Sequence, residues 1–425
     1  MTTRLTRLAV SVLSLVAVAL FLGVLTGRSE LFLVGVPLLA TLLWTTAGTR
    51  APECVVTHEI SADRLLEGER LTVTVTVEAR SGAPLIEILE PLPATVELAA
   101  GRNRAVFGLR SGQRVRWTYD LRCAGRGRFT LGTVCVRVWE RFGYRVHESR
   151  HVDPKPICVY PRMVPLRHLP QPRRTQTSIG NYVSATFGEG LEPGEIRPFA
   201  PGDRVRHVDW RTSLRLGRLY VTQYHQERNA DVVVMLDTLS RVGAPPETSL
   251  DLCVRAAAAL ASAYLARKDR VGLIEYGGAL RWVRPGVGRT QHERLLDSFL
   301  STSSMFSYVA KDLASVPPRI LPPQALVIAL SPLLDPRFVQ AVGDLTARGF
   351  DVVLLAVSPV DLTRSSLALT PLDDLACRLW ALERQAQLAD LRRQGLRVLE
   401  WHPDQPLELA LAPFARRHHR WAMVG

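Results

Sequence analysis

The amino-acid sequence predicts an α/β protein with a doubly wound sheet, preceded by an all-β sandwich-like domain and an N-terminal transmembrane helical hairpin. Three observations predict this order: two long apolar runs at the start, short alternating runs up to about residue 160, and continuous apolar runs beyond residue 219. A chain of 425 residues exceeds one ordinary domain. We therefore divide it into residues 1–50, 51–160, 161–218 and 219–425.

The two apolar runs near the start, Leu8–Thr26 and Leu31–Gly48, each approach the ~20 residues that cross a bilayer. A secretory signal is the alternative, but no small-x-small cleavage site follows and a second span begins almost at once. Because Arg4, Arg7 and Arg50 flank the pair, the positive-inside rule favours both ends in the cytoplasm. We therefore expect a multi-pass protein of the cell membrane with most of its chain in the cytoplasm.

The formal net charge of +13 comes mainly from arginines that are spread along the chain. Dispersed arginines favour a solvated surface, and a basic face on anionic lipid headgroups is the alternative. We expect no nucleic-acid partner, because no basic run is interleaved with aromatic residues. The six cysteines lack C-x-x-C spacing, so we expect small buried residues and no zinc or redox site.

Alternation with a period of two marks the segment from about Glu59 to Tyr160. It is clearest over Leu71–Val77 and over Val115–Leu121, and it indicates half-buried strands. Glycine-containing turn signals recur between the runs, as in an antiparallel sandwich of about 100 residues. Pro161 to Gly190 follows as a linker, because its prolines discourage regular structure.

Beyond residue 219, runs that are apolar on both faces are typical of a covered parallel sheet. The predicted strands are Ala230–Asp237, Arg270–Tyr276, Ala325–Leu330, Phe350–Val357 and Leu396–Leu399. The predicted helices are Leu250–Lys268, Arg337–Arg348 and Asp373–Gln394. This βαβ alternation predicts a doubly wound α/β domain.

A long motif of charged, glycine and aromatic residues precedes this domain. Its members are Gly190, Glu192, Arg197, Gly202, Asp203, Arg206, Asp209, Trp210, Ser213 and Arg215. With the Arg126–Gly132 strand and the Arg141–Tyr144 corner, it resembles the domain of unknown function 58 family, although Glu140-Arg141 replaces the family's Asp-Pro. The resemblance implies a β-domain paired with a von Willebrand factor A-like domain, and partnership with a MoxR-type AAA+ ATPase.

Asp237 ends the first apolar strand, where an open α/β sheet binds ligands. In a von Willebrand A-like site, Thr290 and Asp335 would complete a set of oxygen ligands for Mg²⁺. Leu239 and Arg241 stand where two serine ligands belong, so the site is degenerate. The alternative is a strand-end carboxylate that caps a helix or pairs with an arginine, for which Arg241 is the candidate.

The signature motif allows two interpretations. As a recognition surface it would receive a partner's charged segment. As a structural element, Asp203, Arg206, Asp209 and Arg211 would pair among themselves while Trp210 packs under the sheet. The candidate partner-binding residues are Arg197, Gly202, Asp203, Arg206, Asp209, Trp210, Arg211, Ser213 and Arg215.

We expect a membrane-anchored, non-enzymatic scaffold or adaptor that works with the ATPase on protein clients in protein or envelope assembly. The alternative is an adhesion-type module in which a partner's carboxylate completes the coordination of Mg²⁺. An enzyme is not predicted, because no nucleophile, base and orienting group are spaced recognisably and no Gly-rich phosphate loop of the Walker type occurs.

Overall fold

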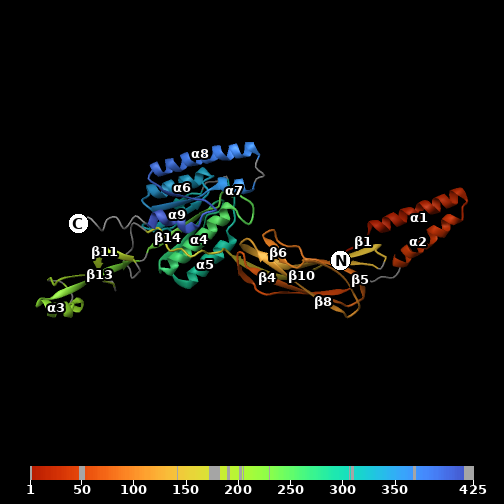
Figure 1. The fold of residues 1–425 in the computed structure, drawn as a ribbon, viewed down its shortest axis with the longest axis horizontal. Helices are drawn as coiled ribbons and strands as arrows, with labels where there is room; N and C mark the ends of the chain where they lie inside the picture. Colours follow the sequence, from red (N-terminus) through yellow and green to blue (C-terminus); the bar gives the residue numbers. More distant parts are fainter. Residues whose placement is uncertain are drawn as a thin grey trace. The chain divides into compact units, whose positions relative to one another are not determined.

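The protein was analysed as a computed structural model, which describes residues 2–46, 53–140, 142–171, 182–188, 192–200, 203, 205–228, 230–305, 307, 311–366 and 370–415. The chain divides into two compact units, Met1–Tyr160 and Pro161–Gly425 (Figure 1).

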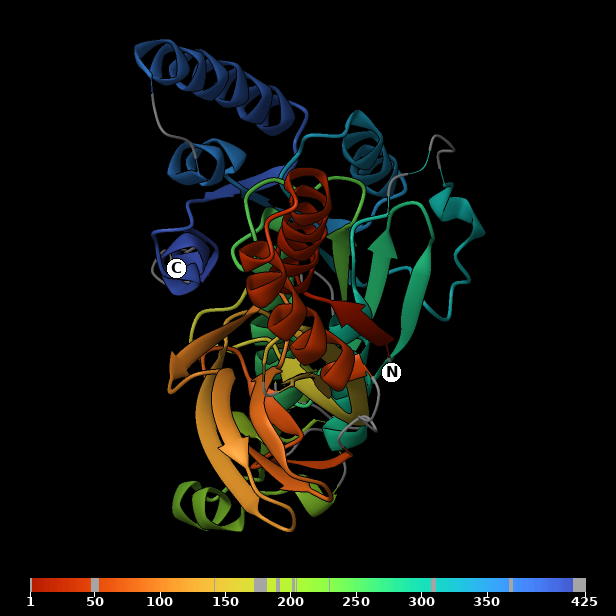
Figure 2. The same cartoon turned by 90° about the vertical axis from the view of Figure 1, so that its right-hand side faces the viewer.

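Unit 1 begins with two apolar helices, α1 (Arg7–Thr26) and α2 (Glu30–Thr46). They lie side by side (Figure 2), joined by a tight turn in which Gly27 adopts φ 68°, a left-handed conformation that glycine tolerates best. Of the described helices, α1 and α4 are long and apolar enough to cross a membrane. The apolar window of α4 is 72% buried, so α4 is a core helix, and α2 is a shorter apolar helix with Pro37 inside.

Two antiparallel sheets form the rest of unit 1. One has the order β2 (Cys54–Ile60), β4 (Arg70–Ala79), β8 (Arg114–Cys123), β6 (Val96–Ala100). The other has the order β1 (Thr2–Leu5), β10 (Arg145–Tyr160), β9 (Gly127–Trp139), β5 (Ala83–Leu89), β7 (Arg104–Leu109), and β3 (Arg64–Leu66) pairs in parallel with β10. The alternation predicted over Leu71–Val77 is confirmed, because every second side chain of β4 is buried in the core between the sheets.

Strand β1 ties the start of α1 to this β-rich part. Thr2–Leu5 pair with Arg145–Glu148 of β10. Thr6, the N-cap of α1, donates its backbone N–H to the Tyr144 carbonyl at 2.9 Å and its hydroxyl to the Gly143 carbonyl at 2.7 Å. Strand β2 begins eight residues after α2 ends. Both ends of the helical pair therefore lead into the same folded unit.

The main sheet of unit 2 has six strands in the order β16 (Arg281–Gly286), β15 (Arg270–Tyr276), β14 (Asp231–Asp237), β17 (Leu326–Ser331), β18 (Asp351–Val357), β19 (Arg397–Trp401). Only the pairing of β16 with β15 is antiparallel. Numbered along the chain this is the doubly wound order 3-2-1-4-5-6, so the predicted α/β sheet is confirmed. The antiparallel edge strand β16 was not predicted.

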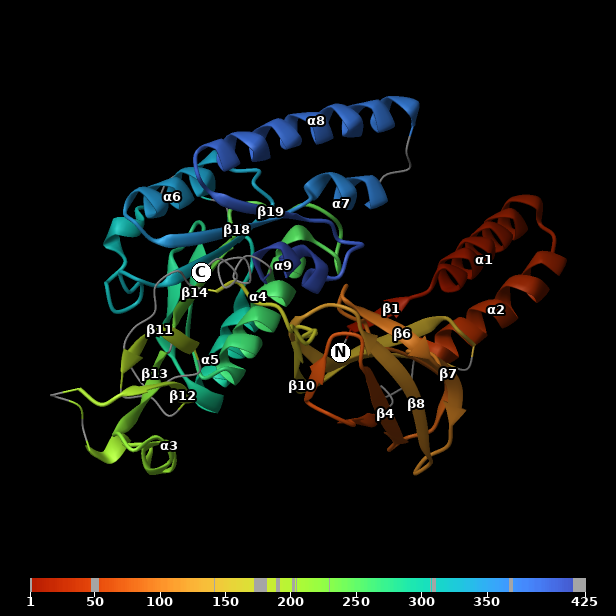
Figure 3. The ribbon, with the colours of Figure 1, turned by 60° about the vertical axis from the view of Figure 1, so that its left-hand side comes forward.

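Helices cover both faces of this sheet (Figure 3). One face packs against α4 (Ser249–Ala266), α5 (Gly288–Ser301) and α9 (Leu407–Ala415), and the other against α6 (Pro336–Ala347) and α8 (Pro371–Arg393). α7 (Pro359–Ser366) follows β18. Because both faces are covered, every residue of β14 is buried, as the continuous apolar run predicts.

Residues 182–228, expected to be linker and irregular signature up to residue 218, contain a second sheet. Strand β13 (Tyr220–Arg228) lies between β11 (Tyr182–Gly188) and β12 (Glu192–Pro198), antiparallel to both. A short 3₁₀ turn (Val205–His207) and helix α3 (Trp210–Leu216) connect β12 to β13. Prolines at the ends of β12 did not prevent pairing, because edge strands tolerate a missing donor.

Candidate functional site

Asp237 occupies the carboxyl end of β14, the central position from which the strand order runs in both directions. Its side chain is fully buried. One carboxylate oxygen accepts the backbone N–H of Leu239 at 2.9 Å, and the other accepts the hydroxyl of Ser331 at 2.5 Å. Burial raises the pKa of Asp237 to about 7, although these two hydrogen bonds and the charge of Arg337 act to lower it.

Ser331, the last residue of β17, links this carboxylate to the next loop. Its hydroxyl oxygen also accepts the backbone N–H of Leu333 at 2.8 Å. Leu333 adopts φ 58°, which is unusual for a branched side chain and indicates a loop held in place by its surroundings. The serine hydroxyl therefore fixes the turn that leads to Asp335.

Asp335 caps helix α6 and binds an arginine. Its carboxylate accepts the Arg337 backbone N–H at 2.9 Å and two guanidinium nitrogens at 2.9 and 2.6 Å. The Arg337 side chain holds the pKa of Asp335 below its usual range. Arg337 also donates to the Ser307 carbonyl. The sequence suggested that Arg241 pairs with Asp237 in place of a metal ion. Arg241 is instead exposed, and neither hydrogen bond to the Asp237 carboxylate comes from it. The arginine that binds a carboxylate at this site is Arg337, on Asp335.

The structure does not bring Thr290 to this site. Strand β16 runs antiparallel to β15, so its last residue, Gly286, pairs with Val271, whereas Asp237 pairs with Tyr276 at the other end of β15. Val271 and Tyr276 are five residues apart on β15, so the end of β16 lies roughly 16 Å along the sheet from the Asp237 end. Thr290 lies exposed in the first turn of α5, near that far end, so of the three residues expected to hold Mg²⁺ it is not at the site.

A pocket of about 470 Å³ lies beside the Asp335–Arg337 pair. Tyr276 and Arg337 are two of the residues that line it. Helix α6 and the 311–314 segment line the rest of it. The Tyr276 hydroxyl donates to the Lys311 carbonyl at 2.9 Å, which joins the two walls. The charged lining residues are Lys311, Asp312, Arg337, Asp344 and Arg348. No serine, cysteine or histidine is among the residues that line this pocket.

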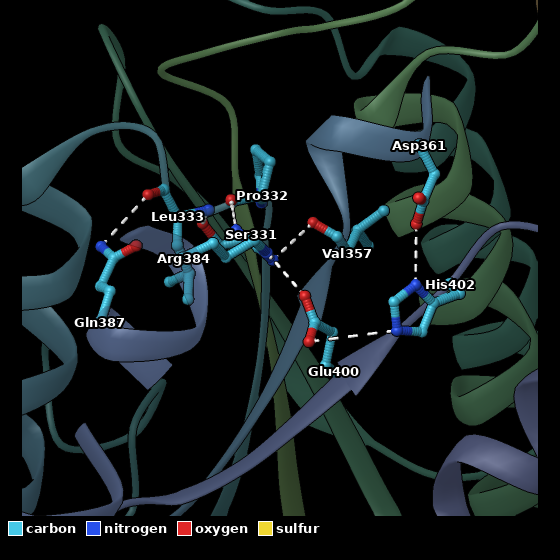
Figure 4. Close-up of polar contacts among 9 residues, drawn as sticks. All are labelled: Ser331, Pro332, Leu333, Val357, Asp361, Arg384, Gln387, Glu400 and His402. Carbon is cyan, nitrogen blue, oxygen red and sulfur yellow. Dashed lines mark hydrogen bonds and ion pairs between the residues drawn. The ribbon is translucent and has the colours of Figure 1, made fainter. Parts of the chain in front are cut away.

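A buried arginine on α8 connects the Asp335 loop to the far strands of the sheet (Figure 4). Arg384 donates to the carbonyls of Pro332 and Val357 at 2.7 and 2.8 Å and to the Glu400 carboxylate at 2.8 Å. These groups stand at or near the carboxyl ends of β17, β18 and β19. Arg384 thus fixes three parallel strand ends relative to one another, the loop after Ser331 included.

Beyond Glu400 the same view shows His402, whose Nδ1 lies 2.7 Å from Asp361. Both residues line a pocket of about 620 Å³ together with Glu247, Arg364 and Asp404. Among the described residues no group of three or more histidine, cysteine, aspartate or glutamate side chains is arranged to hold a metal ion.

Of the nine predicted partner-binding residues, the structure describes eight, and four of these eight make contacts inside the domain. Arg197 and Asp203 form a bidentate pair at 2.8 and 2.6 Å. Asp209 caps α3 by accepting the Thr212 N–H at 3.0 Å, and the buried Ser213 hydroxyl accepts the Tyr220 N–H at 2.9 Å. The Ser213 contact holds α3 against β13, while Asp203 pairs with Arg197, which the structural interpretation did not name.

The other half faces outward. Trp210 is 59% exposed, so the expectation that it packs under the sheet is wrong: Ser213, not Trp210, occupies the buried face of α3. Arg206, Arg211 and Arg215 are also exposed. Gly202, like the corner residue Arg141, lies outside the described residues.

Sequence reasoning missed three residues that build the site: Ser331, Arg337 and Arg384. A serine directly after a buried strand that neighbours the Asp237 strand was a usable signal for the first. The other two were invisible, because an arginine in a helical run looks like a solvated charge until its helix is placed over the strand ends.

Comparison with known proteins finds similarity to one family over most of the signature and the first part of the α/β domain. Residues 195–368 match the model of "Protein of unknown function DUF58". An uncharacterised protein of Mycobacterium tuberculosis is 28% identical over 163 residues, which cover 37% of this chain and 51% of the relative. Uncharacterised protein YeaD of Bacillus subtilis is 23% identical over 189 residues, covering 43% and 47%. The chain thus spans about half the length of these curated relatives.

Among solved structures, the cupredoxin domain of amoB from Nitrosocaldus yellowstonii matches 26% of this chain and 88% of its own, at 13% identity and a TM-score of 0.19. Such a score defines no common fold. Similarity to the DUF58 family of proteins of unknown function is thus found for residues 195–368, and uncharacterised relatives match a similar share of the chain.

Proposed function

We propose that this protein is a membrane-anchored, non-enzymatic adaptor that holds protein partners at the carboxyl edge of a von Willebrand A-like sheet. The family resemblance suggests that it works with a MoxR-type AAA+ ATPase in protein or envelope assembly. The sheet order 3-2-1-4-5-6 with its antiparallel edge strand, and the aspartate that ends the first strand, support the von Willebrand A-like interpretation.

The single observation that carries the proposal is the character of the pocket beside Arg337. Among the described residues it is lined by lysine, arginine and aspartate side chains, together with Tyr276, Leu313 and three alanines. Such a surface of mixed charge and apolar groups can receive a charged segment of a partner. The adjacent Asp335 already forms an ion pair with Arg337, so both charged groups are held in fixed positions. Groups fixed in this way can recognise a charged segment of a partner.

The helical pair supports the anchor. Strand β1 before α1 and strand β2 after α2 belong to the same folded unit, so they must lie on the same side of a bilayer. An even number of crossings satisfies this condition, as a hairpin of α1 and α2 does. A cytoplasmic position of that unit follows from the positive flanks of the pair.

Site-specific photo-crosslinking from Gln340, which lines the pocket, tests the proposal in cells. Crosslinks to a MoxR-type ATPase or to its protein clients are expected from Gln340, and not from Arg294, an exposed position on α5. If both positions gave the same weak background, the pocket would not be the docking site.

A Mg²⁺-dependent adhesion module is the second candidate, and one observation favours it. The Asp237 carboxylate is buried with a pKa raised to about 7, and the buried Ser240 hydroxyl, three residues on, has no hydrogen-bond partner among the described residues. Both are oxygen groups of the kind that Mg²⁺ prefers. Calorimetric titration with Mg²⁺ tests this function: heat that disappears in Asp237→Ala would support it, and no heat from the unaltered chain would exclude it.

A further inference from the structure

Helix α3 presents a two-part outer surface that the contacts with β13 leave open. At 100° per residue, Arg211 and Arg215 lie almost opposite the buried Ser213. Trp210 and Leu214, four residues apart, lie on the same side of the helix, between the buried face at Ser213 and the basic face. Trp210 is 59% and Leu214 83% exposed. The helix thus carries a basic outer stripe and an apolar stripe side by side.

Among the side chains that the structure describes around this surface, the exposed charges are positive. Arg206 and Arg218 flank the helix and are exposed. Of the described acids, Asp203 binds Arg197 and Asp209 caps the helix. Val205, another exposed apolar side chain, precedes the helix. An anionic partner with an apolar layer beneath its charges would complement both stripes.

We propose that α3 rests on the anionic headgroup layer of the membrane in which the chain is anchored. Tryptophan is enriched at the membrane interface, where its ring is partly buried and partly wet, and arginines contact the lipid phosphates. A helix of seven residues is too short to insert, but two exposed apolar side chains can enter the interface. The inference rests on the membrane attachment proposed above.

A bilayer fits this surface better than a protein partner for two reasons. The 470 and 620 Å³ pockets are lined by residues of other elements, so neither supplies a groove beside α3. In addition, a flat fluid surface can meet an isolated two-turn helix, whereas protein interfaces centre an exposed tryptophan in a fitted pocket of the partner.

Lipid quenching of Trp210 in the full chain tests the contact. The protein is reconstituted into phosphatidylcholine vesicles with and without phosphatidylserine, using lipids brominated on the acyl chain. The difference between the unaltered chain and Trp210→Phe isolates the Trp210 emission from that of the other seven tryptophans. We expect quenching of this component in the anionic vesicles, and its weakening at high salt.

The double variant Arg211→Glu/Arg215→Glu is expected to weaken the contact by about tenfold or more, measured from the phosphatidylserine fraction that gives half-maximal quenching. The matched control, Arg284→Glu/Arg294→Glu, makes the same change of charge on exposed residues of the α/β domain and should leave the quenching unchanged.

Equal quenching in neutral and anionic vesicles would overturn the proposal, and so would no quenching in either. If instead Trp210 crosslinks to a polypeptide while its emission is unquenched, the surface belongs to a protein. If alkaline carbonate released the chain from membranes, the proposed anchor would be refuted but the α3 contact would not. The contact would then be tested by adding the same vesicles to the released protein and measuring the quenching of Trp210.

Discussion

The Ser331 hydroxyl donates a 2.5 Å hydrogen bond to the buried carboxylate of Asp237 and so joins the carboxyl ends of β17 and β14. Where a von Willebrand A-like site would have a cation between its loops, this chain has a serine between two strands and an arginine on the Asp335 carboxylate. Hydrogen bonds and an ion pair thus hold the Asp237 and Asp335 carboxylates in place, and this arrangement makes specific predictions.

Replacement of Asp237 by asparagine is expected to change how stability depends on pH. Because burial raises the folded-state pKa of Asp237 from 3.8 to about 7, the native state binds more protons than the unfolded state between these values. The aspartate therefore destabilises the fold as pH rises from about 4 to 7, by on the order of 4 kcal/mol at pH 8. Asp237→Asn should remove this slope in urea unfolding of the detergent-solubilised chain.

A retained slope in Asp237→Asn would show that another group causes it. Ser331→Ala is the matched variant, since it removes a hydrogen bond that lowers the pKa of Asp237 and should extend the loss of stability to higher pH.

Arg384→Met is expected to destabilise the α/β domain by about 3 kcal/mol or more, because it leaves the Glu400 carboxylate and two strand-end carbonyls without their donor. Hydrogen exchange at the Leu333 amide should accelerate as the loop after Ser331 loosens. Arg378→Met, an exposed arginine on the same helix, should have no measurable effect on either quantity. Equal effects of the two variants would contradict the role of Arg384.

The β-rich part of unit 1 contains a buried polar cluster that we expect to be essential for its stability. Glu90 accepts hydrogen bonds from the Tyr119 hydroxyl and from the Gly132 N–H at 2.8 Å, and one of its oxygens lies 3.0 Å from His58 Nε2. Burial acts to raise the pKa of Glu90, but these three contacts outweigh it and hold the pKa below the usual value.

The stability that Glu90 contributes is therefore present above the ordinary glutamate pKa and is lost as pH falls through the lowered one. Glu90→Ala should cost about 3 kcal/mol or more at neutral pH, whereas Glu97→Ala, an exposed glutamate of β6, should be nearly neutral. Unfolding curves of the two full-length variants at neutral and acid pH decide between these outcomes.

Millimolar Mg²⁺ is expected to leave the unfolding temperature of the unaltered chain unchanged, since Arg337 already occupies both carboxylate oxygens of Asp335. Arg337→Gln frees that carboxylate beside Asp237 and should make the unfolding temperature rise with Mg²⁺. Stabilisation of the unaltered chain by Mg²⁺, reversed by EDTA, would instead favour the adhesion-type module.

The sequence predicted the architecture well where one physical rule dominates. Runs such as Ala230–Asp237 are apolar on both faces, and they became covered parallel strands within a residue or two of their expected ends. It predicted poorly where a contact depends on distant segments. Thr290 matched a loop position by its neighbours in sequence, but the antiparallel β16 carries it to the opposite edge of the sheet.

Residues of the signature motif show the same division. Their spacing suggested pairs among Asp203, Arg206, Asp209 and Arg211, whereas Asp203 pairs with Arg197 of β12. Whether Trp210 is buried could not be read from the motif, because a helix of two turns has no hydrophobic period long enough to define its inner face.

Recovery of a MoxR-type AAA+ ATPase with the full-length chain is the most direct test of an adaptor that docks partners beside Arg337. Membranes are solubilised in detergent with a slowly hydrolysed ATP analogue. We would quantify the ATPase that copurifies with each of three chains: the unaltered chain, Arg337→Asp and the control Arg284→Asp. The account predicts equal recovery with the unaltered chain and the control, and a loss with Arg337→Asp. Recovery that is absent from all three, or the same for all three, would contradict it.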